Sequence, residues 1–387
     1  MIFETYIKDT AYGGYGVGTM PDGRVIFLPH TVKGDTVSCS VTDDKKNFCY
    51  GEMKKLITPS ELRGELYCPH IGACGGCVFG HIAYGAQADI KKNFVLAQLN
   101  RAKLELPEPE LFTAEITEFR NRATFRIKDR QIGFYKFKSN DFIPVDACPV
   151  IKTTMVEKAK ALAAATDGGD YALYVTENEK GEALGRTDAG VADLFGFTGL
   201  KAAGNVMGER TITFETKYGV FYAGFDTFLQ GNRYLSEKLQ DFVYENSAGG
   251  TALELYCGAG FLTLPLAKRA DDVTAAEISA QSVSLGRKAG LKNVRWFSSP
   301  SEDLVGTLKG RFSTIVVDPP RTGLDKKTAD FIKKSGAERI IYISCGPDTL
   351  ARDISRMKDV YMIDKLRIID MFPGSYHVES AVLLKNV

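Results

Sequence analysis

The pattern of hydrophobic and polar positions changes twice along the chain and divides it into three parts. Residues 1–58 contain short runs rich in Val, Ile, Tyr and Phe, separated by turn sequences such as Pro21-Asp22-Gly23. Short strands at this spacing are typical of a small β-barrel of the OB type. From about residue 216, strand-like apolar runs alternate with helical segments, which predicts a doubly wound α/β domain with a parallel sheet.

The middle part, residues 59–215, combines a cysteine-bearing loop, one helix and a second set of strands. Apolar residues recur at helical spacing over 86–104, which predicts an amphipathic helix. Residues 110–215 return to alternating polarity broken by glycine-rich turns, and we interpret them as strands. We therefore predict a mixed α/β fold with three domains: an OB-like barrel over 1–58, a β-rich central domain over 59–215 and an α/β domain over 216–387.

Composition and charge narrow the class of protein only slightly. The chain has 387 residues, of which 44% are hydrophobic and 25% charged, and these values are ordinary for a globular protein. The net charge of +1 argues neither for nor against a nucleic-acid partner. No apolar run is long enough to cross a bilayer, and the first residues lack the pattern of a signal peptide. We therefore expect a cytoplasmic protein with no membrane partner.

One short stretch has the residue types of a nucleic-acid-binding surface. Residues 119–130 interleave arginine and lysine with phenylalanine. Cations and aromatic residues alternate in this way on strands that bind RNA. A solvated antiparallel strand would show the same alternation, so the sequence leaves both interpretations open.

Cys345 comes directly after the apolar run 339–344, and Pro347 then begins a helix-like segment. A thiol at the carboxyl end of a strand, facing a helix N-terminus, gains from the positive end of that helix. We therefore expect Cys345 to favour its thiolate form and to act as a nucleophile at the edge of the sheet where ligands bind. The alternative is a buried cysteine with a structural role.

A glycine turn and two carboxylates at strand ends indicate a cofactor site. The strand 251–256 is followed by Cys257-Gly258-Ala259-Gly260 and a helical segment, and the glycines let a ligand approach the backbone closely. Glu277 ends the next strand, where a carboxylate can accept hydrogen bonds from both ribose hydroxyls. Asp318 ends a third strand, within Asp-Pro-Pro-Arg. Each acid alone could be a solvated or turn-forming carboxylate, but together they resemble the class I methyltransferases that use S-adenosylmethionine.

The middle part also contains a candidate metal site. Three cysteines lie within ten residues, and a fourth, followed by proline, lies further along the chain. Four thiolates suit either tetrahedral zinc or a [4Fe–4S] cluster. His70 and His81 would be ligands only if the fourth cysteine lies elsewhere. The predicted ligands are Cys68, Cys74, Cys77 and Cys148, whereas Cys39, Cys49 and Cys257 are expected to be packed in the interior.

The C-terminal motifs give the chain a family resemblance. With Cys345 and the Asp-Pro-Pro-Arg sequence, the tail 372–379 resembles that of RNA uracil-C5 methyltransferases, in the branch that acts on 23S ribosomal RNA. The glycine cluster at 13–18 and the strands after it resemble a TRAM domain, which occurs in several RNA-modifying enzymes. The resemblance implies that [4Fe–4S] rather than zinc occupies the four cysteines. It also implies that the nucleophile is Cys345, that the base is Glu379, and that the cofactor contacts are Gln230, Tyr256, Glu277 and Asp318.

The expected chemistry explains why a thiol and a carboxylate are needed. Carbon 5 of uracil is a poor nucleophile, so a thiolate must first add to carbon 6. The resulting enolate attacks the methyl carbon, a base removes the proton from carbon 5, and elimination releases the thiolate. Glu379 borders an apolar strand and could have the raised pKa that suits this base. Taken alone, it could equally be an ordinary surface carboxylate.

Two residues differ from the family pattern, and the sequence leaves other functions open. Gly346 stands where the family usually has Asn, and Phe261 replaces a smaller or polar residue. Methylation of an amino group on a base or protein also uses Asp-Pro-Pro but needs no thiol, and a non-catalytic RNA-binding assembly factor could keep the fold. Transfer RNA is the alternative substrate to 23S ribosomal RNA. The target uridine must leave its stack to reach the thiol, and we expect a monomer.

Overall fold

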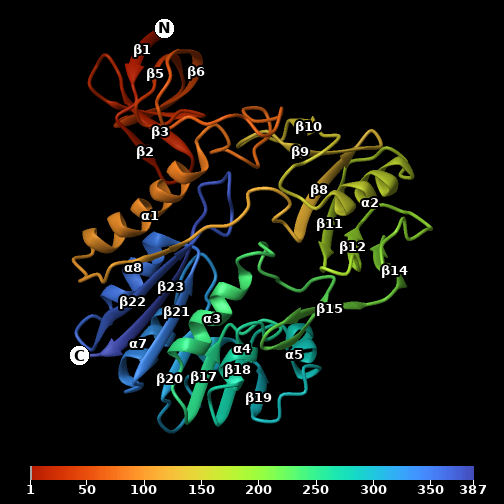
Figure 1. Cartoon of the computed structure of the whole chain (residues 1–387), viewed down its shortest axis with the longest axis vertical. Helices are drawn as coiled ribbons and strands as arrows, with labels where there is room; N and C mark the ends of the chain where they lie inside the picture. The colour runs from red at the N-terminus through yellow and green to blue at the C-terminus, as the bar shows by residue number, and fades with distance from the viewer. Residues whose placement is uncertain (1) are drawn as a thin grey trace.

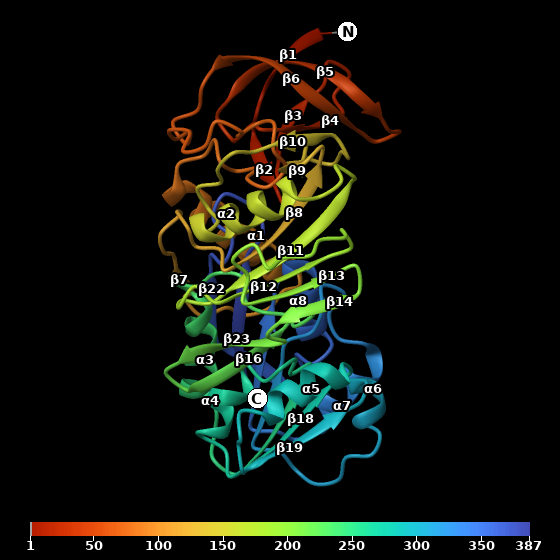
Figure 2. The same cartoon turned by 90° about the vertical axis from the view of Figure 1, so that its right-hand side faces the viewer.

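The structure, a computed structural model, describes residues 2–387 and is elongated (Figure 1). The N-terminal strands lie at one end, a seven-stranded sheet lies in the middle and the C-terminal α/β domain lies at the other end (Figure 2). Within the described residues, no helix has both the length and the apolar character needed to span a membrane.

The N-terminal strands form one six-stranded sheet in the order β1-β5-β6-β4-β3-β2. Burial alternates along these strands, and their inward side chains, including Ile26, Leu28 and Val37, form a small core. Cys39 and Cys49 lie in this core, as expected. The strands are β1 (Ile2–Tyr6), β2 (Asp9–Ala11), β3 (Tyr15–Thr19), β4 (Val25–Pro29), β5 (Thr36–Asp44) and β6 (Phe48–Thr58).

The central sheet has the order β10-β9-β8-β11-β12-β13-β14. Helix α2 (Thr153–Ala164) packs its apolar side chains on one face of this sheet, and alternate residues of β8, such as Phe125 and Ile127, complete the core. The strands are β8 (Arg122–Lys128), β9 (Gln131–Tyr135), β10 (Phe142–Pro144), β11 (Tyr171–Glu177), β12 (Ala183–Thr187), β13 (Gly199–Ala202) and β14 (Asn205–Gly208). A separate ribbon, β15 (Thr211–Thr216) and β16 (Gly219–Gly224), spans the boundary predicted at residue 216.

The C-terminal sheet has the order β19-β18-β17-β20-β21-β23-β22-β7. Its first five strands are parallel, and four of them (β17, β18, β20 and β21) coincide with predicted runs, whereas β19 was not predicted. Strand β23 pairs antiparallel with β21. The strands are β17 (Thr251–Leu255), β18 (Asp272–Glu277), β19 (Val294–Ser298), β20 (Thr314–Val317), β21 (Arg339–Ser344), β22 (Tyr361–Ile369) and β23 (Glu379–Asn386). Strand β7 (Glu110–Phe112) lies in the part predicted as central, yet pairs with β22 at the edge of this sheet.

Helices cover both faces of the C-terminal sheet, so consecutive strand residues are buried in different cores. Leu253 and Tyr342 belong to one core, whereas Ala252 and Ile341 belong to the other. This is the doubly wound arrangement that the alternation of strands and helices predicts. The helices are α3 (Ser236–Asn246), α4 (Thr263–Ala267), α5 (Ala280–Arg287), α6 (Ser301–Leu304), α7 (Lys326–Lys334) and α8 (Pro347–Ser355).

Helix α1 (Tyr84–Arg101) confirms the helix predicted over 86–104 and joins the barrel side to the C-terminal domain. Phe94 packs in a small cluster beside the barrel, whereas Leu99 belongs to a core of the C-terminal sheet. The Lys91 ammonium lies 2.6 Å from the carboxylate of Asp370, which follows β22, and both side chains are 1% exposed. This buried ion pair fixes α1 against the segment that leads into Glu379, the predicted base.

Candidate active site and cysteine cavity

The carboxyl ends of the parallel strands border a cavity of about 560 Å³. Parallel strands in an open sheet end at one edge, and ligands bind there. The six residues predicted for catalysis and cofactor contact all line this cavity, although they come from distant parts of the chain: Gln230, Tyr256, Glu277, Asp318, Cys345 and Glu379.

The turn after β17 shapes the cofactor side of the cavity. Tyr256 has φ 63°, a left-handed conformation that is uncommon for a non-glycine residue and often marks a functional site. The Gly258 amide donates to Oε2 of Glu277 at 3.2 Å, and the Ser279 amide donates to Oε1 at 2.9 Å. A Cβ at Gly258 would meet no atom within 4 Å, so open space lies over this turn. The turn and the fixed carboxylate fit a nucleoside with its ribose at Glu277.

Two further carboxyls carry raised pKa values on this side. Burial raises the pKa of Asp318 to about 7. Burial also raises the pKa of Glu254 to about 8, and the charge of Asp318 adds to the shift. Glu254 lines a small adjoining cavity with Asp318 and Gln230, and its Oε2 has no hydrogen-bond partner among the described residues. Glu254 was not among the site residues predicted from the sequence. An acid inside the apolar run Leu-Glu-Leu is the sequence feature that could have indicated a buried carboxyl there.

Cys345 lies where the sequence places it, between β21 and α8, but its electrostatic state differs from the prediction. Burial raises the pKa of its thiol most, the carboxylates of Glu379 and Asp318 also raise it, Arg321 opposes them, and the resulting pKa is about 11. The expected thiolate in the free protein is therefore wrong, because burial and two nearby acids outweigh the helix N-terminus. Gly346 fits locally, since a Cβ there would lie 2.6 Å from the Thr349 hydroxyl.

Glu379 begins β23 and is 6% exposed. Burial raises its pKa well above the usual value, the charge of Asp318 adds to this effect and Arg321 opposes it. The raised pKa expected for a general base therefore agrees with the environment of this carboxyl.

Arg321 and His377 also line the cavity, although the sequence predicts no role for either. An Nη atom of Arg321 lies 3.3 Å from Nε2 of His377. Burial and the charge of Arg321 lower the pKa of His377 to about 4, so the imidazole is neutral at physiological pH. Arg321 therefore supplies the permanent positive charge beside the thiol.

The four predicted ligand cysteines line a second cavity, of about 240 Å³. Burial raises the pKa of Cys148 to about 12, and the neighbouring thiols Cys77 and Cys74 contribute. Within residues 2–387, however, no three His, Cys, Asp or Glu side chains are arranged to hold a metal ion. His70 borders the cavity, but His81 does not. The four thiols therefore line one cavity, but among the described residues they are not arranged as the ligands of a metal ion.

The stretch 119–130 forms part of the open face of the central sheet. Along β8, Phe125 points into the core, whereas Arg122 and Arg126 point to the other side. The Arg126 guanidinium lies 4.6 Å from the centroid of the Tyr135 ring. Arg122 lies 5.5 Å from the ring of Phe228, which is 63% exposed and lines the active-site cavity. The cations and aromatic rings therefore continue to the mouth of the cavity.

Comparison with known proteins agrees with this architecture. Residues 209–298 and 291–387 match the family model described as tRNA (Uracil-5-)-methyltransferase, and residues 3–54 match the TRAM domain. Uncharacterised RNA methyltransferases of Protochlamydia amoebophila (strain UWE25) and Thermotoga maritima are each 27% identical to this chain. The first alignment covers 99% of this chain and 98% of the relative, and the second covers 99% of both.

A solved structure has the same fold over the whole chain. The tRNA (uracil-54, C5)-methyltransferase of Pyrococcus abyssi, in complex with S-adenosyl-L-homocysteine, matches with a TM-score of 0.82 and 22% identity. The match covers 99% of this chain and 100% of that chain. The predicted fold, a barrel and a β-rich part followed by a Rossmann-like methyltransferase domain, is confirmed. The C-terminal part of the chain, residues 209–387, therefore matches the family of RNA uracil-5 methyltransferases, and residues 3–54 match the TRAM domain.

Proposed function

We propose that this protein methylates carbon 5 of a uridine in RNA through a covalent bond between Cys345 and carbon 6 of the uracil. The observation that carries the proposal is the common cavity of Cys345, Glu379 and the cofactor-side carboxylates. A thiol that only packed in the interior would not need to border an open cavity with a buried acid beside it. Methylation of an amino group would not need this thiol at all.

S-adenosylmethionine, when bound, supplies an electrophilic methyl group. Glu277 would hold its ribose, while Gln230 and Tyr256 would contact the rest of the cofactor. The donor is positively charged at sulfur, so its binding favours the ionised form of Asp318 and offsets the charge that raises the pKa of Cys345. We therefore infer that the thiol becomes a nucleophile only in the complex, with Arg321 favouring the thiolate.

The reaction then uses two side chains of this chain. Sγ of Cys345 forms a bond to carbon 6, and the electron pair of the C5–C6 bond moves towards the carbonyl at carbon 4. Carbon 5 of this enolate would take the methyl group as its bond to the donor sulfur breaks, which would leave neutral S-adenosyl-L-homocysteine. Glu379 removes the remaining proton from carbon 5, the double bond forms again and Sγ leaves. A buried carboxyl with a raised pKa is a stronger base when ionised, which suits this proton transfer.

RNA containing 5-fluorouridine tests the covalent step, because fluorine at carbon 5 cannot be removed as a proton. With S-adenosylmethionine present, the wild-type protein should form a complex with this RNA that survives denaturation. The Cys345→Ala variant should form none while binding S-adenosylmethionine like the wild type. Methylation of RNA by Cys345→Ala would overturn the mechanism, and absence of any methyl transfer by the wild type would favour a non-catalytic factor.

We propose 23S ribosomal RNA as the substrate, with transfer RNA as the alternative. The support is the sequence resemblance stated above, in which the four cysteines belong to the ribosomal branch. The TRAM domain does not separate the two substrates, because the P. abyssi protein, which acts on transfer RNA by its name, matches 99% of this chain. Mapping 5-methyluridine in both RNA classes from a strain lacking this gene distinguishes them. The division at residues 58 and 215, the cytoplasmic location and the monomeric state stay predictions.

We also propose that Cys68, Cys74, Cys77 and Cys148 hold a [4Fe–4S] cluster. Their thiols face one cavity bordered by small residues such as Gly76 and Ala147, and this donor set fits the cluster. The cluster would fix the cysteine loop against the central sheet, and methyl transfer needs no electron from it. Iron and sulfide analysis of anaerobically purified protein tests this, and colourless protein that contains zinc would overturn it.

A further inference from the structure

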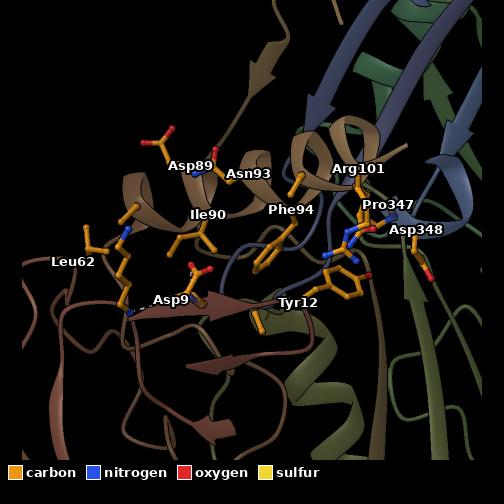
Figure 3. A pocket seen from close by; sticks show the side chains of 16 residues that line it. Asp9, Tyr12, Leu62, Asp89, Ile90, Asn93, Phe94, Arg101, Pro347 and Asp348 are labelled. Atoms are coloured by element: carbon orange, nitrogen blue, oxygen red, sulfur yellow. Dashed lines mark hydrogen bonds between the residues drawn. The ribbon is translucent and has the colours of Figure 1, made fainter. Parts of the chain in front are cut away.

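A larger cavity, of about 700 Å³, lies between the barrel, helix α1 and the start of α8 (Figure 3). In Figure 3, α1 lies above the cavity and extends Ile90 and Phe94 towards it, whereas β2 and the residues after it lie below. Pro347 and Asp348 border one end of the cavity. None of the residues proposed above for catalysis or cofactor binding lines this space.

Aromatic contacts connect this cavity with the active site. The Tyr12 ring packs edge-on against Tyr376, with 5.3 Å between centroids. Tyr376 in turn lies 4.2 Å from the ring of His377, which lines the catalytic cavity. Cys345 is close enough to contribute to the raised pKa of Tyr12, and Pro347, which lines the cavity, lies two positions after Cys345. A polymer with one unit at Cys345 can therefore place a neighbouring unit beyond Tyr12.

Two side chains in the lining have the chemistry to bind a nucleotide, although three carboxylates also line the cavity. Tyr12 is 40% exposed and offers an aromatic surface, and burial raises its pKa to about 12, so its hydroxyl stays neutral. Arg101 extends from α1 towards the same end of the cavity (Figure 3). Among the described residues, Asp89 pairs with Lys92 rather than with Arg101, which makes no ion pair. A free guanidinium beside an exposed ring matches a phosphate joined to a base.

We propose that this cavity binds the nucleotide that adjoins the target uridine, with its base stacked on Tyr12 and its phosphate beside Arg101. The inference rests on the proposed function, because it requires an RNA strand with a uridine at Cys345. It assigns the barrel and α1 a direct part in selecting the RNA strand.

The test uses single-stranded RNAs with one 5-fluorouridine, chosen from a randomised pool because they trap the wild-type protein. Each RNA is also made with an abasic nucleotide directly before or directly after the 5-fluorouridine. For the wild type, removing one of these two bases should weaken binding on the order of tenfold, the effect of one stacked base. Tyr12→Ala removes the aromatic ring, and Ala97→Trp fills the cavity from α1. Both variants should bind the intact RNA about tenfold more weakly than the wild type, and the abasic nucleotide should no longer weaken their binding.

Asn100→Trp is the matched control, since Asn100 is an exposed residue of α1 outside the cavity lining. It should bind RNA like the wild type, and all variants should bind S-adenosylmethionine equally, which shows that they fold. If the wild type traps RNA but Tyr12→Ala and Ala97→Trp keep its affinity and its sensitivity to the abasic site, the inference is wrong. If the wild type traps no 5-fluorouridine RNA, the proposed function itself fails.

Discussion

The buried ion pair between Lys91 and Asp370 should dominate the stability of the contact between α1 and the C-terminal domain. The ammonium lies 2.6 Å from the carboxylate and also donates to the Phe372 carbonyl at 2.9 Å. Replacing Lys91 with Met leaves a carboxylate that is 1% exposed without its cation. Breaking a buried pair on one side costs about 3–5 kcal/mol, so Lys91→Met should lower the free energy of unfolding by this amount.

Urea denaturation followed by tryptophan fluorescence measures this loss. Trp296 is the single tryptophan and lies in β19 of the C-terminal sheet, the sheet that also contains the strand before Asp370. Replacing both partners, as in Lys91→Met with Asp370→Leu, should recover most of the stability, because no charge then stays buried alone.

Lys92→Met is the control for this measurement, on the same helix. Lys92 pairs with Asp89 at 3.2 Å, but the two side chains are 31% and 65% exposed. An exposed pair of this kind contributes less than about 1 kcal/mol. Equal losses for Lys91→Met and Lys92→Met would refute the reasoning, since burial would then make no difference.

Three further outcomes follow from the site. Glu379→Gln should form the covalent adduct with ordinary uridine RNA but release it slowly, and normal turnover in methyl-transfer assays would exclude Glu379 as the base. Asp318→Asn should lower the pKa of Cys345 below its value of about 11, because one of the carboxylates that disfavour the thiolate is gone. Iodoacetamide should then alkylate Cys345 faster at pH 8. An unchanged alkylation rate would show that Asp318 does not contribute to the raised pKa. Asp318 has a pKa of about 7 through burial, so the preference for cationic S-adenosylmethionine over neutral S-adenosylhomocysteine should weaken as the pH falls below 7 and Asp318 takes up a proton. Calorimetry at pH 6 and 8 measures that preference, and a constant ratio of the two affinities would count against it.

The sequence predicts those parts of the site that follow from strand order. Glu277, Asp318 and Cys345 each end a parallel strand, and such ends meet at one edge whatever the details of packing. The same argument predicts the doubly wound domain. The sequence is enough here because the position of each residue in the site depends only on the strand that it ends and on the direction of that strand.

Interactions between distant segments could not be predicted in this way. A helix N-terminus follows Cys345 in the chain, but the acids that raise its pKa are Asp318, directly after β20, and Glu379, at the start of β23. Lys91 and Asp370 are 279 positions apart, and nothing in the amphipathic pattern of α1 marks a lysine as buried. Strand β7 shows only three residues of strand pattern, so its partner β22 is not visible from the sequence.

The raised pKa values on the cofactor side have a common physical meaning. Asp318 and Glu254 share a small buried space, while Arg321 is the permanent cation in the described lining of the active-site cavity. Ionised carboxyls in such a space favour a positively charged ligand. The free-energy cost of burying these charges falls when such a ligand binds. On the proposed function, the methyl donor carries that charge at sulfur and loses it when carbon 5 takes the methyl group. The carboxylates that favour binding of the donor therefore hold the product less tightly, and the same charges contribute to both substrate capture and product release.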